Sequence, residues 1–261
     1  MAKIIDFHTH PFLDDNSNIC DHKDIIPVKK EDIRATFDGL GVEMICGSVI
    51  ILDSPLPPWD NIRACNDAAL ELREYFGEFY YPGFHIHPEF IPESIGEIKR
   101  FAEKGFRLVG ELVPYLHGWL DYSCKEFSYL LDACREYDMV VNLHAMDDSV
   151  YDDQVDKMVT EHKDVKIVMA HPGEYDTFMR HLKRMDISEN YYVDLSGTGL
   201  FRHAMLARGI ADYGAERFLF GSDYPTCNPA MFVGGVVLDD LISPEDKEKI
   251  LYTNAKKLLR L

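Results

Sequence analysis

Eight short stretches rich in β-branched and aromatic residues recur along the chain and constrain its fold more than any other feature. The segments between them show the 3.6-residue apolar periodicity of amphipathic helices, so strands and helices are predicted to alternate. Such alternation is typical of β-α-β units, whose strands run parallel. The expected strands comprise residues 4–10, 44–52, 80–88, 107–115, 139–145, 166–173, 191–197 and 218–225.

Eight such units are what a (β/α)8 barrel, or TIM barrel, requires, and the 261 residues are close to the ~250 of a typical one. A doubly wound α/β sheet is the alternative, but it usually has fewer strands and a glycine-rich first turn. The chain has no G-x-G-x-x-G or Walker motif. We therefore predict a single (β/α)8 domain over residues 1–261.

Two helix starts carry explicit capping signals. Ser243-Pro244 predicts an N-cap followed by a proline in the first turn, and Ser123-x-x-Glu126 predicts a capping box. Apolar residues at helical spacing follow both signals, so a helix is expected after each.

Charge, apolar runs and cysteines limit the partners and the compartment. The chain has 27 basic and 45 acidic residues, a net charge of −18, which argues against a protein that binds nucleic acid. No apolar run reaches the ~20 residues that span a membrane, and the N-terminal residues do not resemble a signal peptide. Six scattered cysteines without a C-x-x-C pair favour reduced thiols in the cytoplasm. By analogy with other barrels of this kind, which often form dimers, a homodimer is the assembly to test.

Six side chains that can bind metals fall near the C-terminal ends of the expected strands. His8 and His10 are two apart on the first strand, so their side chains leave the same face. In a barrel these strand ends meet at one mouth, where loops build active sites. Each residue alone could be a hydrogen-bonding group, but ligation explains the whole set: His8, His10, Glu111, His144, His171 and Asp223. Four imidazoles and two carboxylates suit one or two divalent cations, with zinc favoured and manganese or iron as alternatives.

The motifs around these residues resemble a known family. They are Asp6-Phe7-His8-Thr9-His10, Leu143-His144, Met169-Ala170-His171-Pro172-Gly173, Phe220-Gly221-Ser222-Asp223-Tyr224-Pro225 and Asn254-Ala255-Lys256-Lys257-Leu258-Leu259. Together they resemble the amidohydrolase superfamily over essentially the whole chain. The most similar branch is the "amidohydrolase 2" group of metal-dependent TIM-barrel hydrolases, which includes aminocarboxymuconate-semialdehyde decarboxylase.

The resemblance implies roles for five of the six residues. It makes His8, His10, His144 and Asp223 metal ligands. The residue that matches His171 contacts the substrate or the attacking water in one-metal members, and is itself a ligand in two-metal members.

The fourth expected strand departs from that branch. Its relatives often read G-[IV]-K-L-H-P there, whereas this chain has Val109-Gly110-Glu111-Leu112-Val113-Pro114. Glu111 thus stands in place of the lysine. In other branches of the superfamily a carboxylate here bridges two metals, so Glu111 is expected to bridge or ligate; the alternative is that it only hydrogen-bonds a ligand histidine.

The resemblance predicts a metal-dependent hydrolase acting on an amide, lactone or ester of a small molecule. A metal-activated water would attack the carbonyl, with Asp223 as the general base and His171 as a second catalytic residue. The alternative is a non-oxidative decarboxylase of a small aromatic or muconate-like acid, because the branch contains both chemistries. A TatD-type phosphodiesterase is a third hypothesis, and the net charge of −18 argues against it.

Other residues near the strand ends have weaker expected roles. His85 and His87 are expected to be structural, with substrate contact as the alternative. Several further side chains could orient ligands or shape the pocket: Asn142, Asp194, Ser196, His117, Trp119, Arg202 and His203. Cys227 also falls near the expected mouth but has no evident partner for nucleophilic catalysis.

Overall fold

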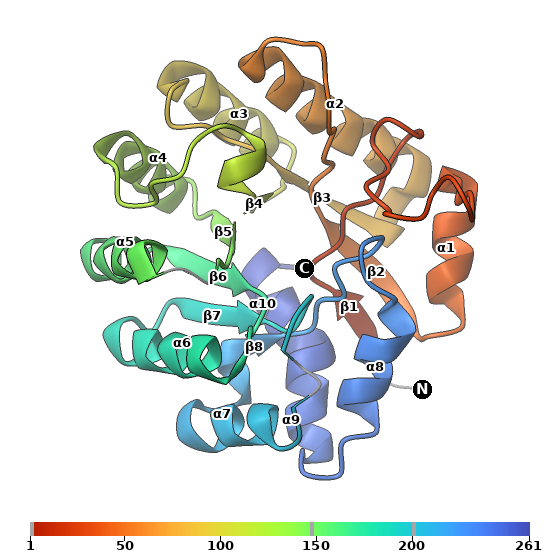
Figure 1. Cartoon of the computed structure of the whole chain (residues 1–261), viewed down its shortest axis with the longest axis vertical. Helices are drawn as coiled ribbons and strands as arrows, with labels where there is room; N and C mark the ends of the chain where they lie inside the picture. The colour runs from red at the N-terminus through yellow and green to blue at the C-terminus, as the bar shows by residue number, and fades with distance from the viewer. Residues whose placement is uncertain (1–2, 147–148, 200–201) are drawn as a thin grey trace.

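The structure, a computed structural model, describes residues 3–146, 149–199 and 202–261. It contains eight parallel strands that follow one another in chain order around a single sheet (Figure 1). Each lies within one of the eight stretches predicted from the sequence, or overlaps it. They are β1 (Ile4–Asp6), β2 (Val42–Gly47), β3 (Tyr80–Phe84), β4 (Leu108–Leu112), β5 (Val140–His144), β6 (Lys166–Ala170), β7 (Tyr191–Asp194) and β8 (Phe218–Leu219).

Backbone hydrogen bonds between the segments that directly follow the first and last strands close the sheet. The amide of Phe7 donates to the carbonyl of Phe220 at 2.8 Å, and the amide of His10 donates to the carbonyl of Tyr224 at 2.6 Å. Thr9 forms a further parallel bridge with Tyr224. The chain is therefore a (β/α)8 barrel, and this prediction is confirmed.

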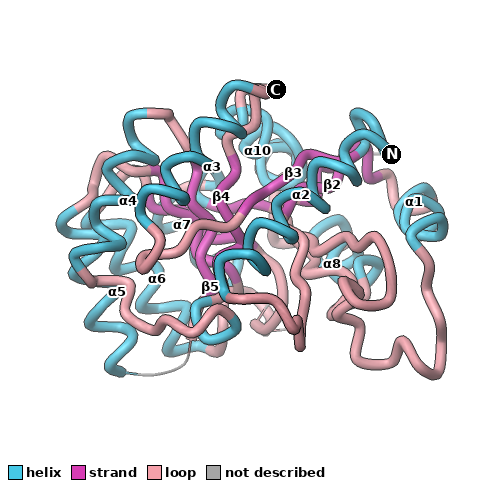
Figure 2. Tube along the Cα trace, turned by 90° about the horizontal axis from the view of Figure 1, so that it is seen from above, coloured by secondary structure: helices cyan, strands magenta, loops and turns pink. Residues whose placement is uncertain are grey.

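Helices surround the strands on the outside of the barrel (Figure 2). Each long helix turns an apolar stripe inward, as Ile98 and Phe101 of α3 do, so the core lies between the helices and the strands. The helices are α1 (Lys30–Asp38), α2 (Pro58–Phe76), α3 (Ile91–Glu103), α4 (Lys125–Glu136), α5 (Ser149–Glu161), α6 (Tyr175–Ile187), α7 (Met205–Tyr213), α8 (Pro229–Val237), α9 (Pro244–Glu248) and α10 (Asn254–Leu259). Within the described ranges, none of them combines the length and the apolar character that a bilayer span requires.

The paired strands are shorter than the apolar stretches that predicted them. β1 ends at Asp6, so His8 and His10 follow the strand rather than lying on it, and β8 comprises only Phe218–Leu219. The chain stays largely buried beyond these ends, but its amides now reach only single partners instead of a ladder. Apolar patterning reports burial, and here burial extends further than regular strand pairing.

One capping prediction is confirmed and the other is shifted by one residue. The hydroxyl of Ser243 accepts the amide of Asp246 at 3.1 Å, as expected of an N-cap. At α4 the N-cap is Cys124, whose sulfur accepts the amide of Phe127. The hydroxyl of Ser123 donates instead to Asp121 at 2.8 Å, so this side chain is not free to cap the helix.

Asn254 anchors the C-terminal helix to β8. Its Nδ2 donates to the carbonyls of Ala215 and Phe218, both at 2.8 Å, and the side chain is buried. Asn254→Ala would leave two buried carbonyls without this donor, and we expect it to lower the free energy of unfolding by about 1–3 kcal/mol. Urea denaturation measures the change. In the control Asn190→Ala an exposed bond to Lys163 is lost, and a change below about 0.5 kcal/mol is expected; equal losses in the two variants would contradict the anchoring role.

Candidate metal centre

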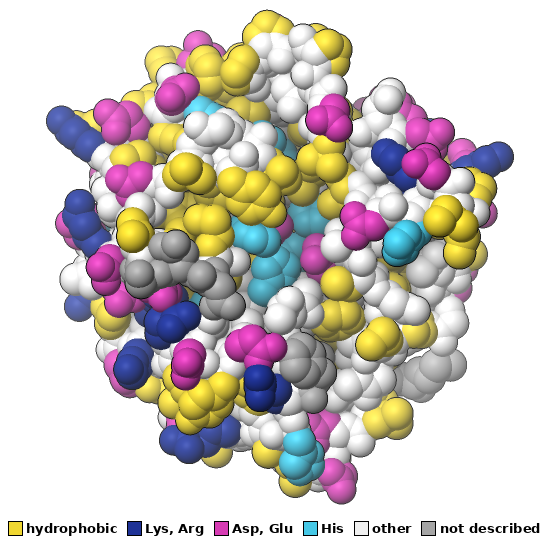
Figure 3. Space-filling model, viewed as in Figure 1, with side chains coloured by type: hydrophobic (Ala, Val, Ile, Leu, Met, Phe, Trp, Pro, Cys, Tyr) yellow, Lys and Arg dark blue, Asp and Glu magenta, His cyan; other side chains and the backbone are white. Residues whose placement is uncertain are grey.

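All six residues that the sequence predicted as ligands meet at the C-terminal mouth of the barrel. They form two adjacent groups, in each of which one ligand atom per residue lies within 4.8 Å of the others. We call His8, His10 and Asp223 the first trio, and Glu111, His144 and His171 the second trio. In the space-filling view, histidine side chains line the central hollow of this face (Figure 3).

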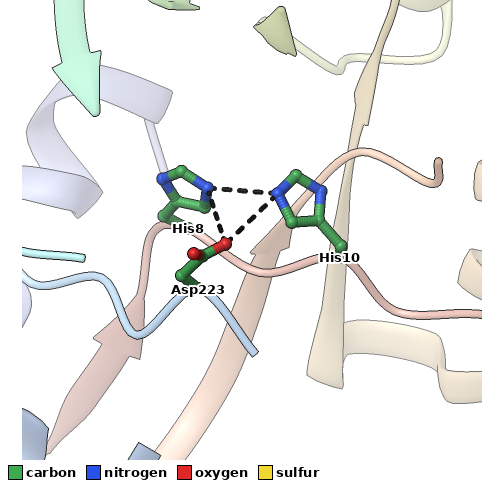
Figure 4. Close-up of side chains that lie close together, drawn as sticks. All are labelled: His8, His10 and Asp223. Carbon is green, nitrogen blue, oxygen red and sulfur yellow. Dashed lines mark hydrogen bonds and ion pairs between the residues drawn. The ribbon is translucent and has the colours of Figure 1, made fainter. Parts of the chain in front are cut away.

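The first trio joins the beginning and the end of the barrel (Figure 4). The Nε2 atoms of His8 and His10 are 3.2 Å apart, and Oδ1 of Asp223 lies 3.6 Å from each of them. A cation ~2.0–2.1 Å from tetrahedrally arranged donors holds those donors ~3.4 Å apart. The spacing of the first trio therefore matches a set of ligands around one small cation.

Glu111 lies between the two trios. Its Oε2 is 3.4 Å from Nε2 of His10 and 3.5 Å from Nε2 of His8. Its Oε1 is 3.0 Å from Nδ1 of His144 and 3.4 Å from Nε2 of His171. One carboxylate oxygen thus faces each trio, which is the arrangement of a carboxylate that can bridge two cations.

Hydrogen bonds to the Nδ1 atoms of His8 and His10 fix the orientation and the tautomer of each ring. Nδ1 of His10 lies 3.0 Å from the carbonyl of Ser48, which can only accept, so this nitrogen carries the proton. Nδ1 of His8 lies 3.0 Å from a carboxylate oxygen of Asp194, with the same consequence. In the neutral rings both Nε2 atoms are then bare lone pairs that point at each other. Two facing lone pairs need a proton or a cation between them, so the donor set fits a divalent metal.

Ser196 extends this support to the second trio. Its hydroxyl donates to Oδ1 of Asp194, so its oxygen is left to accept. Nδ1 of His171 lies 3.1 Å from that oxygen and Nδ1 of His8 lies 3.0 Å from it. His171 therefore also turns a bare Nε2 toward Glu111 and His144. The sequence marked both Asp194 and Ser196 as residues that could orient ligands. Asp194 contacts His8, and Ser196 contacts a histidine of each trio.

We expect Ser196→Ala to weaken cation binding about 10- to 100-fold, because His8 and His171 would lose the oxygen that fixes their rings. Isothermal titration with Zn²⁺ or Mn²⁺ measures the affinity. Ser188→Ala is the matched control, since its buried hydroxyl donates to the carbonyl of Lys163 away from the mouth. Unchanged affinity in Ser196→Ala would remove Ser196 from the support of the centre, whereas Ser196→Thr keeps the hydroxyl and is expected to retain most of the affinity.

The charges of the mouth are strongly coupled. Burial disfavours the ionised form of Glu111, but the neighbouring His8 and His144 outweigh it and hold the pKa of Glu111 well below its ordinary value. Burial also opposes protonation of His8, yet the carboxylates of Asp194 and Glu111 raise the pKa of His8 well above its usual range. The pKa of His171 is raised in the same way, against burial, chiefly by Glu111. The carboxylates thus create a site that attracts positive charge.

Two of the six residues have a left-handed backbone at the point where the chain leaves the barrel. His171 has φ +66° and Asp223 has φ +61°, a conformation that costs non-glycine residues about 1–3 kcal/mol and is concentrated at functional sites. Gly197 packs so closely on His171 that a Cβ there would lie 2.3 Å from Nδ1 of the ring. Glycine is therefore required beside this histidine.

A cavity of about 460 Å³ opens beside the second trio. This volume is in the range of small-molecule sites. It is lined by His144, Ala145, Met146, His171, Gly173, Thr177, Gly197, Thr198, Asp223, Thr226 and Cys227.

The other residues singled out from the sequence have mixed placements. His85 is fully buried, its Nε2 lies 2.8 Å from the carbonyl of Val49, and burial lowers its pKa to about 4. His87 contacts the carbonyl of His117 at 2.9 Å, so both predicted structural histidines have structural contacts.

The remaining residues singled out from the sequence lie in different surroundings. Trp119 is packed in the core, His203 lines an outer groove, and Arg202 pairs with Glu174. The side chain of Asn142 donates to Asp194 at 2.9 Å.

Sequence reasoning missed two contributors to the site. Ser48 acts through its carbonyl, which any residue could supply, so no sequence signal exists for it. Tyr115 is half exposed and its ring lies edge-on to His144, with centroids 5.4 Å apart. It directly follows Pro114 at the end of the fourth apolar stretch, and that position at a strand end was the available signal.

Comparison with solved structures agrees with the fold. The crystal structure of 2,6-dihydroxybenzoate decarboxylase complexed with 2,6-dihydroxybenzoate is 17% identical, with 100% of each chain covered and a TM-score of 0.77. A dihydroxybenzoic acid decarboxylase from Polaromonas sp. JS666, with bound manganese and the inhibitor 2-nitroresorcinol, is 16% identical, with 100% of this chain and 98% of that chain covered and a TM-score of 0.71. A probable 2-pyrone-4,6-dicarboxylic acid hydrolase from Acinetobacter baumannii, with citric acid bound, is 13% identical, with coverage of 99% and 100% and a TM-score of 0.67. At these identities the likeness shows a shared fold.

No curated protein matches the chain. The family described as Amidohydrolase matches residues 5–261, which is nearly the entire sequence. The match includes every motif on which the resemblance rested, from the histidines after β1 to the last helix. The chain therefore belongs to the amidohydrolase family.

Proposed function

We propose that this chain is a divalent-metal-dependent enzyme that acts on the carboxylate or carbonyl group of a small molecule. The observation that carries the proposal is the facing pair of Nε2 lone pairs on His8 and His10, with Asp223 and Glu111 beside them. His144 and His171 complete the set. Zinc suits these donors, and manganese is the metal bound in the Polaromonas decarboxylase. Six free cysteines support a cytoplasmic location.

A divalent cation held there would supply Lewis acidity, polarising a substrate oxygen or lowering the pKa of a water molecule. The side chains of the site would transfer protons and hold the histidines in orientation. Asp223 and His171 both line the cavity, where they can take or return a proton at the reacting atom. Asp194 and Ser196 hold His8 and His171 in orientation throughout.

Non-oxidative decarboxylation of a small aromatic or muconate-like acid is the first candidate reaction. Its support is the full-length likeness to the two decarboxylases described above, since it places comparable chemistry on a comparable barrel. In this reaction the bond between the carbon skeleton and the carboxyl carbon breaks and carbon dioxide leaves. The electron pair stays on the skeleton and takes up a proton, which Asp223 or His171 in the cavity wall would deliver.

Hydrolysis of an amide, lactone or ester is the second candidate, and Glu111 favours it. A carboxylate with one oxygen on each trio can hold two cations side by side, and paired cations suit the attack of water on a carbonyl. The likeness to the probable 2-pyrone-4,6-dicarboxylic acid hydrolase also supports this reading.

The deciding experiment incubates protein loaded with Zn²⁺ or Mn²⁺ with 2,6-dihydroxybenzoate and related acids, and measures carbon dioxide release and the decarboxylated product. A parallel panel of amides, lactones and esters measures hydrolysis. Asp223→Asn and chelator-treated protein are the controls, and both are expected to be inactive. Turnover that survives metal removal, or no turnover on either panel, would overturn the proposal; product from one panel alone selects the reaction.

A further inference from the structure

The wall of the cavity has an unusual charge distribution for a site that receives acids. All its titratable groups except the thiol of Cys227 belong to the two trios: His144, His171 and Asp223. The remaining wall is uncharged, with apolar atoms from Ala145 and Met146 and hydroxyls from three threonines. Among the described lining residues there is neither lysine nor arginine.

One basic residue in the segment after β7 lines a separate groove rather than this cavity. Arg202, in the segment after β7, donates from Nε to Oε2 of Glu174 at 2.7 Å, and both side chains lie in solvent. In the space-filling view, lysines and arginines lie away from the hollow lined by histidines, whose upper rim is hydrophobic (Figure 3). Among the described residues that line this cavity there is thus no basic side chain for an anion, so anion binding there would depend on a cation held by the two trios.

The second carboxylate of a diacid would meet an unfavourable field. It would lie against lining residues that, apart from members of the two trios and the thiol of Cys227, carry no titratable group, in a chain with a net charge of −18. A carboxylate taken from water without a counter-charge or sufficient hydrogen bonds is strongly destabilised. Hydroxyl or ether groups can instead be matched by Thr198 and Thr226, whose side chains are exposed on the wall.

We infer that the site is selective for monocarboxylates: the substrate presents one anionic group to the metal centre and is otherwise uncharged. The inference rests on the proposed function and narrows it, because it favours aromatic monoacids over muconate-like diacids. Met146 on the wall and the half-exposed ring of Tyr115, which packs edge-on against His144 of the wall, suit the flat apolar face of such a ring.

The test compares benzoate with isophthalate, which differs by one added carboxylate. Isothermal titration of the metal-loaded protein gives the affinities. Protection of Cys227 from iodoacetamide, followed by peptide mass spectrometry, shows whether the ligand occupies this cavity, because the thiol lies in its wall. We expect benzoate to bind at least about tenfold more tightly than isophthalate and to protect Cys227.

Thr226→Arg places a cation on the wall at an exposed position, and it is expected to reduce the preference for benzoate at least about fivefold by strengthening isophthalate binding. Thr160→Arg adds the same charge on the exposed face of α5, away from the mouth, and should leave the preference unchanged. Equal affinities in the wild type, no binding of benzoate, or an equal shift in both variants would overturn the inference. Selective binding without any turnover would leave the inference standing and count against the proposed function alone.

Discussion

Glu111→Gln protein is expected to contain at most one equivalent of divalent cation where the wild type contains two, and to lose at least about 10³-fold in turnover. The amide keeps the size of the side chain but removes the charge and one of the two acceptor oxygens. Since one carboxylate oxygen faces each trio, the single acceptor oxygen of glutamine can face only one of them and would not bridge two cations. Plasma mass spectrometry on protein purified without added metal or chelator measures the content per chain.

Glu97→Gln is the matched control for this variant. Glu97 is also buried, but on α3, where its carboxylate accepts from Asn66 and Arg100. Its metal content and turnover should equal those of the wild type. One equivalent in the wild type that Glu111→Gln leaves unchanged would contradict bridging, and would leave Glu111 as a hydrogen-bonding partner of His144.

His10→Ala should reduce turnover at least about 10³-fold and weaken cation binding, because the first trio loses one of its two facing lone pairs. Metal titration and steady-state kinetics measure the two effects. His10 is buried, so circular dichroism must show that the variant folds, and His10→Asn provides a smaller perturbation that also removes the imidazole. His22→Ala changes an exposed histidine and is expected to have no effect. A near-normal rate in folded His10→Ala would refute the assignment of the first trio.

The fold was largely predictable because the periodicity of apolar residues in the sequence indicates which segments form buried strands and which form helices. Each of the eight strands was recognisable, yet β8 is only two residues long where the apolar stretch suggested eight. The reason is that Phe220, Ser222 and Tyr224 stay buried after regular pairing has ended. Helix starts were less certain, since the competition between Ser123 and Asp121 that makes Cys124 the N-cap depends on three-dimensional contacts.

The gathering of the six residues at one mouth also followed from their positions at strand ends. Their relations to one another did not, because the order of strands around a barrel does not say which atom faces which. The double contact of Glu111 depends on the register of β4 against its neighbours. The orientation of His10 depends on a backbone carbonyl at Ser48, and that of His171 on a hydroxyl whose proton is committed to Asp194.

The closure of the barrel between β8 and β1 gives the first trio a part in folding. His8 and His10 follow the first strand and Asp223 follows the last. A cation held by all three would therefore link the two segments between which the barrel closes. A ligand that binds only the native state raises the free energy of unfolding by about 2.7 kcal/mol at a concentration one hundred times its Kd. During synthesis the two histidines emerge well before Asp223, and the nascent chain has an incomplete coordination sphere until its last strand is in place. Uptake of the cation of the first trio would thus mark the end of maturation, and chains arrested before β8 would lack that cation even though the residues of the second trio had already been made.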